Sequence, residues 1–154
     1  MSLRTGRYAI YYESHLVGTV PDEESDAEMV YSKTNDSEAR WDLLRLESGR
    51  YKIFSKGGVV SSRISDDSIY LFYTSADHFP MDWILRPVPV AGPDIYRIEA
   101  PQIIPRVAWT VTHQVQPRQL VLRHATDEPI DAFTQYFRFQ RVKSPSPKPS
   151  YPVE

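Results

Sequence analysis

The sequence predicts an all-β protein: a β-trefoil of twelve short strands in three four-stranded repeats with pseudo-threefold symmetry. A tyrosine-centred pattern occurs three times, at residues 6–10, 49–53 and 94–98, with its tyrosines 43 and 45 residues apart. An aromatic-led pattern follows each copy, at residues 41–46, 83–88 and 137–142. Two patterns that recur in one order at a fixed period are typical of repeat architectures.

Two further strand-like runs lie between these patterns in every repeat, and each alternates apolar with polar residues or is rich in β-branched and aromatic residues. The runs are residues 15–20 and 29–33, 58–64 and 68–74, and 106–112 and 119–124. A single four-stranded unit cannot bury its own apolar face, whereas three units can share one core. A β-sandwich also has many short strands, but it does not explain the threefold recurrence.

The length of 154 residues fits one domain, which we expect to span residues 1–142. Residues 143–154 differ in composition because proline and serine alternate there without an apolar period. Such a segment cannot pack, so we expect an extended, flexible tail.

Composition excludes several classes of function. The net charge is −2 and the pI is about 6.1, whereas a sequence-independent nucleic-acid binder needs a strong basic excess. No segment approaches the roughly 20 apolar residues of a membrane span. The chain has no cysteine, which removes disulfides, zinc–thiolate sites and cysteine nucleophiles and fits a reducing compartment. We therefore expect a cytoplasmic, monomeric protein that binds neither nucleic acid nor membrane.

Known catalytic and metal-binding motifs are missing from the sequence. Its four histidines lack metal-ligand spacing, and it contains no nucleophile elbow, P-loop or dinucleotide fingerprint. We expect no catalytic residue, no metal and no cofactor, and hence no enzyme. Recognition then falls to the loops, since a rigid loop can inhibit a protease by docking in its cleft with little ordering cost.

The opening residues 1–10, followed by residues 16–18 and an acidic stretch, resemble the small cytosolic β-trefoil proteins of mushrooms. The nearest group is the fungal serine-protease inhibitors called mycospins. The mycocypins, which inhibit cysteine proteases, and the ricin-B-like mushroom lectins are more distant. The resemblance implies an inhibitor that presents a lysine or arginine on an exposed loop to a trypsin-like pocket.

Two of the expected loops, residues 21–28 and 125–131, contain no basic residue. The best candidate for the protease-binding loop is therefore Arg63, at a strand-to-loop junction between Ser62 and Ile64. Arg118 is the second candidate. Asn35 is a third, for an asparagine-specific protease.

Carbohydrate binding is the alternative function, because ricin-B-like lectins share the expected fold. Their repeats carry a Gln-x-Trp signature, of which only the third repeat here keeps the glutamine, Gln135, with Phe137 in place of tryptophan. A sugar site would need an exposed aromatic residue near amide groups, and Trp109 with His113 and Gln114 has the right composition. The expected partner is thus a protease, with carbohydrate as the alternative.

Overall fold

The structure is a computed structural model that describes residues 2–63, 67–74, 81–101, 105–112, 118–126 and 132–142. The described part of the chain is built from strands and two short 3₁₀ turns, η1 (Pro89–Ala91) and η2 (Ala132–Gln135). The predicted tail, residues 143–154, lies outside the described residues, as does Ile64. The strands are β1 (Gly6–Tyr12), β2 (His15–Leu16), β3 (Gly18–Pro21), β4 (Glu28–Tyr31), β5 (Trp41–Arg45), β6 (Tyr51–Ser55), β7 (Gly58–Ser62), β8 (Ile69–Phe72), β9 (Ile84–Pro87), β10 (Ile95–Glu99), β11 (Val107–Thr110), β12 (Val121–His124) and β13 (Phe137–Arg141).

One predicted strand, residues 15–20, is divided into β2 and β3. Its first half pairs with β1, where Leu16 faces Tyr11, and its second half pairs with β4, where Gly18 faces Tyr31. Val17 separates the halves and donates its N–H to the Ile10 carbonyl at 2.9 Å. The chain therefore changes partner at Val17, and twelve expected strands become thirteen.

The predicted threefold recurrence is present as a recurring strand pair. In every repeat the tyrosine of the first pattern lies directly opposite the leading aromatic residue of the second. The three antiparallel pairs are Tyr8 with Trp41, Tyr51 with Trp83, and Tyr96 with Phe137. All six side chains are at most 3% exposed, so the two sequence patterns mark the centre of one shared core.

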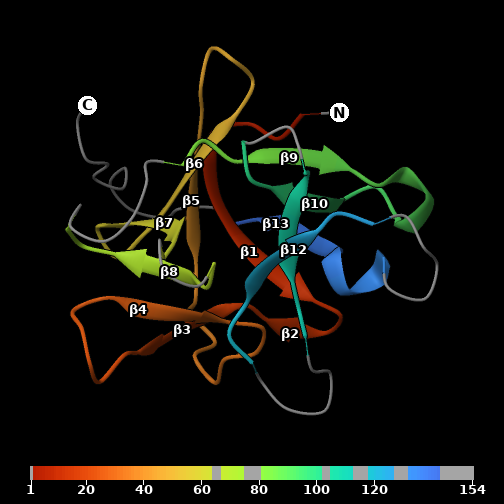
Figure 1. Ribbon diagram of the computed structural model, residues 1–154. Helices are drawn as coiled ribbons and strands as arrows, with labels where there is room; N and C mark the ends of the chain where they lie inside the picture. Colours follow the sequence, from red (N-terminus) through yellow and green to blue (C-terminus); the bar gives the residue numbers. More distant parts are fainter. Residues whose placement is uncertain are drawn as a thin grey trace.

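Six strands, two from each repeat, surround this core, and β1, β5, β10 and β13 cross the middle of Figure 1. Ladders join β13 to β1, β1 to β5, β5 to β6, β9 to β10 and β10 to β13. Between β6 and β9 there is only the single bridge of Tyr51 and Trp83, with hydrogen bonds of 2.8 and 2.7 Å. The ring of strands is continuous only through this residue pair.

Equivalent tryptophans make equivalent hydrogen bonds in the first two repeats. The indole N–H of Trp41 donates to the Val17 carbonyl and that of Trp83 to the Val60 carbonyl, each at 3.1 Å. In the third repeat Phe137 has no such donor, and the ring of Trp109 packs edge-on against it at 6.0 Å. Buried carbonyl groups need a donor, so each indole both fills the core and satisfies the strand beside it.

Six of the remaining strands form three hairpins that meet at one end of the ring, and β2 pairs with β1. Leu120 donates its N–H to the Val30 carbonyl at 2.8 Å, and Ile69 donates to the Leu120 carbonyl at 2.9 Å. All three side chains are fully buried. The β3–β4, β7–β8 and β11–β12 hairpins are thereby joined to one another by backbone hydrogen bonds.

A buried carboxylate connects three neighbouring segments around β10. Glu99, which is 1% exposed, accepts hydrogen bonds from Arg86 at 3.0 Å and from Arg106 at 2.6 Å, and Arg97 lies 3.8 Å away. Burial alone would raise the pKa of Glu99, but the hydrogen bonds from Arg106 and Arg86 outweigh it and lower the pKa below the ordinary glutamate value. The carboxylate joins β9, β10 and the start of β11.

We predict that Trp41→Phe and Trp83→Phe destabilise the protein to a similar extent, each by about 1–3 kcal/mol. Each substitution removes the donor to one buried carbonyl and leaves most of the ring volume in place. Urea unfolding followed by circular dichroism measures both free energies. A cost at one position and none at the other would contradict their structural equivalence.

We predict that Glu99→Gln lowers the free energy of unfolding at pH 7 by about 1.5–3 kcal/mol, because it removes the charge of a buried carboxylate that accepts hydrogen bonds from two half-exposed arginines. A carboxylate whose folded-state pKa is depressed stabilises the protein above its unfolded-state pKa, and this contribution disappears as the pH falls through the folded-state pKa. Urea unfolding at several values below about pH 5 should therefore show a smaller loss of stability in the variant than in the native protein. Equal acid dependence would contradict the assignment.

Candidate functional site

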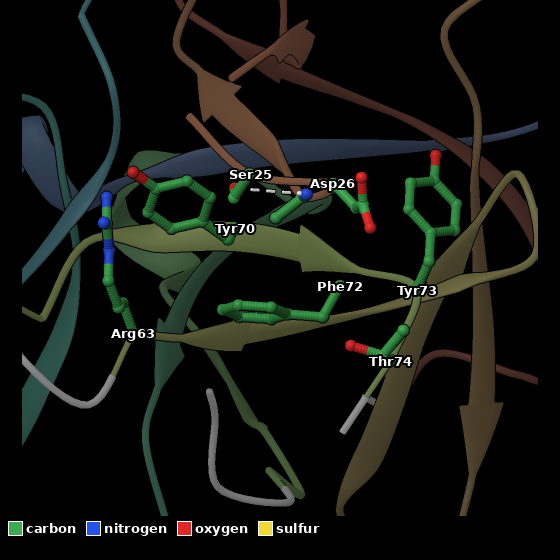
Figure 2. A pocket seen from close by; sticks show the side chains of 8 residues that line it. Ser25, Asp26, Arg63, Tyr70, Phe72, Tyr73 and Thr74 are labelled. Carbon is green, nitrogen blue, oxygen red and sulfur yellow. Dashed lines mark hydrogen bonds between the residues drawn. The ribbon is translucent and has the colours of Figure 1, made fainter. Parts of the chain in front are cut away.

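Arg63 follows the last residue of β7 and forms one wall of a surface cavity of about 310 Å³ (Figure 2). Its guanidinium carbon lies 4.2 Å from the centroid of the Tyr70 ring, and the side chain is half-buried. Phe72 and Tyr73 line the cavity from β8 and the residue after it, and Ser25 and Asp26 approach from the β3–β4 loop. The cation thus stacks on an aromatic ring of its own hairpin, an arrangement that holds the guanidinium in place.

The backbone of Arg63 is engaged within the hairpin. Its N–H donates to the Ser68 carbonyl at 2.8 Å, and its carbonyl accepts from the Asp67 N–H at 3.2 Å. Ser62 pairs with Ile69 and is 4% exposed. The prediction that Arg63 lies where a strand meets a loop is confirmed. The expectation that Ser62 would flank it at the surface is wrong, because the strand pairing turns Ser62 into the interior.

The acidic β3–β4 loop is held by its own polar groups. The Asp22 carboxylate accepts from the Glu24 N–H at 3.2 Å and from the Ser25 hydroxyl at 2.9 Å. The Ser25 hydroxyl in turn accepts from the Ala27 N–H at 3.3 Å, the bond that is dashed in Figure 2. These two bonds to Asp22, with the nearby charge of Arg63, lower the pKa of its carboxyl. The loop has a defined shape, and all of its charged side chains are acidic.

Glu28 links this loop to the neighbouring hairpin. It accepts from Lys56 at 3.1 Å and from the Tyr73 hydroxyl at 2.9 Å, and Lys56 also donates to Thr19 at 3.0 Å. Burial and the hydrogen bond to Glu28 together raise the pKa of Tyr73 to about 12. Lys56 is exposed, but its ammonium group forms an ion pair with Glu28.

Arg118 lies at the surface where the third repeat meets the first. Its carbonyl accepts from the Ser32 N–H at 3.0 Å, and its own N–H donates to the Ser32 hydroxyl at 3.4 Å. The side chain is exposed. The structure therefore brings Arg118 against the β4–β5 loop, although Ser32 lies 86 residues earlier in the chain.

The β4–β5 loop alternates anchored and outward-facing residues. Ser32 is anchored to Arg118, and Thr34 donates its N–H to the Leu16 carbonyl at 2.9 Å. Lys33 and Asn35 are exposed, and none of the hydrogen bonds and ion pairs among the described residues involves either of them. Asn35 is the residue of this loop that the sequence predicted as a candidate, whereas Lys33, two residues earlier, is not among the predicted site residues.

Thr34 packs closely against Gly18 and forms a hydrogen bond with Asp36. A Cβ atom on Gly18 would come within 2.5 Å of the Thr34 methyl group, so only glycine permits this approach. The Thr34 hydroxyl accepts from the Asp36 N–H at 3.1 Å. Asp36 then accepts from the Glu38 and Ala39 N–H groups at 2.9 and 3.1 Å. The loop is thus fixed at Thr34 and again at Asp36.

The aromatic candidate for a sugar site is wrong. Trp109 is fully buried between Trp83 and Phe137 and cannot stack on a ligand; His113 and Gln114 lie outside the described residues. Gln135 is 1% exposed and its amide bonds Thr110, His124 and Thr126 at 2.8–3.1 Å. It braces the third repeat internally.

Within the described ranges, no three histidine, cysteine or acidic side chains cluster in a way that could hold a metal ion. The same part of the chain contains no helix with the length and hydropathy to cross a membrane.

The model of the peptidase inhibitor family I66 matches residues 1–141. The chain belongs to this family. Membership in a family of peptidase inhibitors confirms two predictions: the protein acts on proteases, and it is not an enzyme. No curated protein matches the sequence.

Solved structures confirm the predicted β-trefoil fold. A proteinase inhibitor from Coprinopsis cinerea is 17% identical with a TM-score of 0.75, and the alignment covers 92% of this chain and all of that one. A ricin B-like lectin from Macrolepiota procera, solved with lactose, is 12% identical with a TM-score of 0.63, covering 92% and 99% of the two chains. Albumin 1 of winged bean is 16% identical with a TM-score of 0.63, covering 92% and 94%. Fungal inhibitors and fungal lectins thus share this architecture, as the resemblance implied.

Proposed function

We propose that this inhibitor blocks a trypsin-like serine protease by inserting an exposed loop into the active-site cleft, as a one-to-one complex. The observation that supports it is the basic corner, which we define as Lys33 and Arg118 on backbone segments joined through Ser32. Both side chains are exposed, and the Ser32–Arg118 hydrogen bonds hold their backbones together. A trypsin-like primary pocket contains a carboxylate that accepts a lysine or arginine side chain.

Rigidity makes the basic corner suitable for inhibition. A loop that is already ordered loses little conformational entropy on binding, so more of the interaction energy appears as affinity. The corner is held by hydrogen bonds that cross from the third repeat to the first and from β2 to the loop. Arg63 is a weaker candidate, because docking would require its guanidinium to leave the Tyr70 ring.

Carbohydrate binding is the second candidate, and the cavity beside Arg63 is the observation that favours it. The cavity of about 310 Å³ combines Phe72 and Tyr73 with Ser25, Asp26 and Thr74 (Figure 2). Aromatic rings beside hydroxyl and carboxylate groups are the chemistry that binds a sugar, and the volume is at the lower end for ligand pockets.

The test is inhibition of trypsin, chymotrypsin, papain and legumain, with glycan-array binding in parallel. We expect stoichiometric inhibition of trypsin. Failure to inhibit any serine protease would contradict the proposal. Glycan binding that Phe72→Ala abolishes, without inhibition, would favour the lectin function instead.

A further inference from the structure

We infer that the Lys33–Thr34 peptide bond is the reactive bond of this inhibitor and that Lys33 is the residue that enters the primary pocket of the protease. This inference rests on the proposed function and names the specificity-determining residue of the same site. The three residues singled out from the sequence are Arg63, Arg118 and Asn35, and Lys33 is not among them. The backbone of the described loops distinguishes Lys33 from the two arginines.

A segment that docks like a substrate must form backbone hydrogen bonds with the enzyme, in the manner of an added β-strand. The residue in the primary pocket therefore needs its own N–H and carbonyl free. Arg63 uses both groups to close its hairpin, and Arg118 uses both to hold Ser32. Neither group of Lys33 takes part in a hydrogen bond among the described residues, and the same is true of Asn35.

The side chain of Lys33 forms no hydrogen bond or ion pair among the described residues, which distinguishes it from the other two lysines that the structure describes. Lys52 is paired with Asp82 at 2.9 Å and Lys56 with Glu28 at 3.1 Å. Lys33 is exposed, and no ion pair between described residues includes it. Transfer of its ammonium group to the pocket carboxylate therefore breaks no ion pair among the residues that the structure describes.

The anchoring of Thr34 explains why this bond would inhibit the enzyme instead of serving as a substrate. The serine hydroxyl oxygen of the protease attacks the Lys33 carbonyl carbon while its proton passes to the histidine. The bond to the Thr34 nitrogen then breaks and the histidine returns the proton, which leaves an acyl-enzyme and a Thr34 amine. Leu16, Gly18 and Asp36 hold Thr34 in place, so the amine stays beside the ester and can re-form the peptide bond.

The β-sheet would hold the two halves of a cleaved chain together without a disulfide. Residues 1–33 contain β1, which pairs with β13 and β5, and β4, which pairs with β8, and all three partner strands lie beyond the cleavage point. The chain has no cysteine, so these ladders are the device that keeps the new ends close.

The experiment measures trypsin and chymotrypsin inhibition by the full chain and by Lys33→Ala, Lys33→Arg and Lys33→Leu. We expect Lys33→Ala to raise the trypsin inhibition constant at least about 30-fold, as for the loss of a binding hot spot. Lys33→Arg should retain inhibition within about tenfold, and Lys33→Leu should transfer it to chymotrypsin, whose pocket is hydrophobic. Thermal unfolding of each variant checks that the fold is unchanged, which we expect because Lys33 is exposed and takes part in no hydrogen bond or ion pair among the described residues.

Arg63→Ala is the matched control, because Arg63 stacks on Tyr70 away from the basic corner, and it should change trypsin inhibition by less than about fivefold. Trypsin inhibition that Lys33→Ala leaves intact would overturn the inference while the proposed function stands. An inactive native chain would instead overturn the proposed function. Inhibition lost in Asn35→Ala and kept in Lys33→Ala would move the reactive position to Asn35.

A second readout concerns the Thr34 anchor. Mass spectrometry of the inhibitor incubated with trypsin should show a slowly formed product one water heavier, cut after Lys33. Thr34→Ala removes the Thr34 methyl and hydroxyl groups, and with the hydroxyl the hydrogen bond from the Asp36 N–H, so it should be cut faster and inhibit for a shorter time. A first cut at another bond would contradict the assignment.

Discussion

The aromatic pairs at the centre of the molecule are the constraint on which the rest of the structure depends. Each repeat contributes one tyrosine opposite one tryptophan or phenylalanine, and all six rings are buried. No repeat could bury its own pair, so the three must assemble around a common centre. Burying aromatic side chains supplies a large share of the hydrophobic free energy of a domain of this size. Between β6 and β9 the ring of strands is joined by the single bridge of Tyr51 and Trp83. At this point packing of the buried side chains, more than backbone pairing, holds the two strands together.

Assembly around this centre also brings together loops that are distant in sequence. The three hairpins meet at Val30, Ile69 and Leu120, whose backbones bond one another. One consequence is that Ser32 reaches Arg118, so that the β4–β5 loop rests on a neighbouring repeat. A loop supported from two directions needs neither a disulfide nor a metal to hold its shape. This accounts for an inhibitor without cysteine whose loop bearing Lys33 is ordered before it meets a protease.

The repeats, and therefore the fold, could be predicted from the sequence because they rest on local patterns of aromatic and aliphatic residues. The candidate site was harder to predict from the sequence than the fold. The position of Arg63 at the end of a strand was predicted correctly, but its stacking on Tyr70 depends on the pairing of β7 with β8. The burial of Ser62 and Trp109 likewise follows from tertiary packing. The sequence shows a lysine at position 33 but not what distinguishes it from other lysines. Its neighbours Thr34 and Ser32 donate backbone hydrogen bonds to Leu16 and Arg118, and no local sequence pattern predicts these contacts.

The central claim is that the β4–β5 loop is anchored at alternate residues in the free protein. Native-state hydrogen exchange of the individual backbone amides, followed by NMR, tests it most directly. The amides of Ser32 and Thr34 should be protected, because they donate to the Arg118 and Leu16 carbonyls. The amides of Lys33 and Asn35 should exchange rapidly. Uniformly fast exchange across residues 32–35 would mean that the loop is not preorganised, and protection of Lys33 would mean that its backbone is not available to a protease.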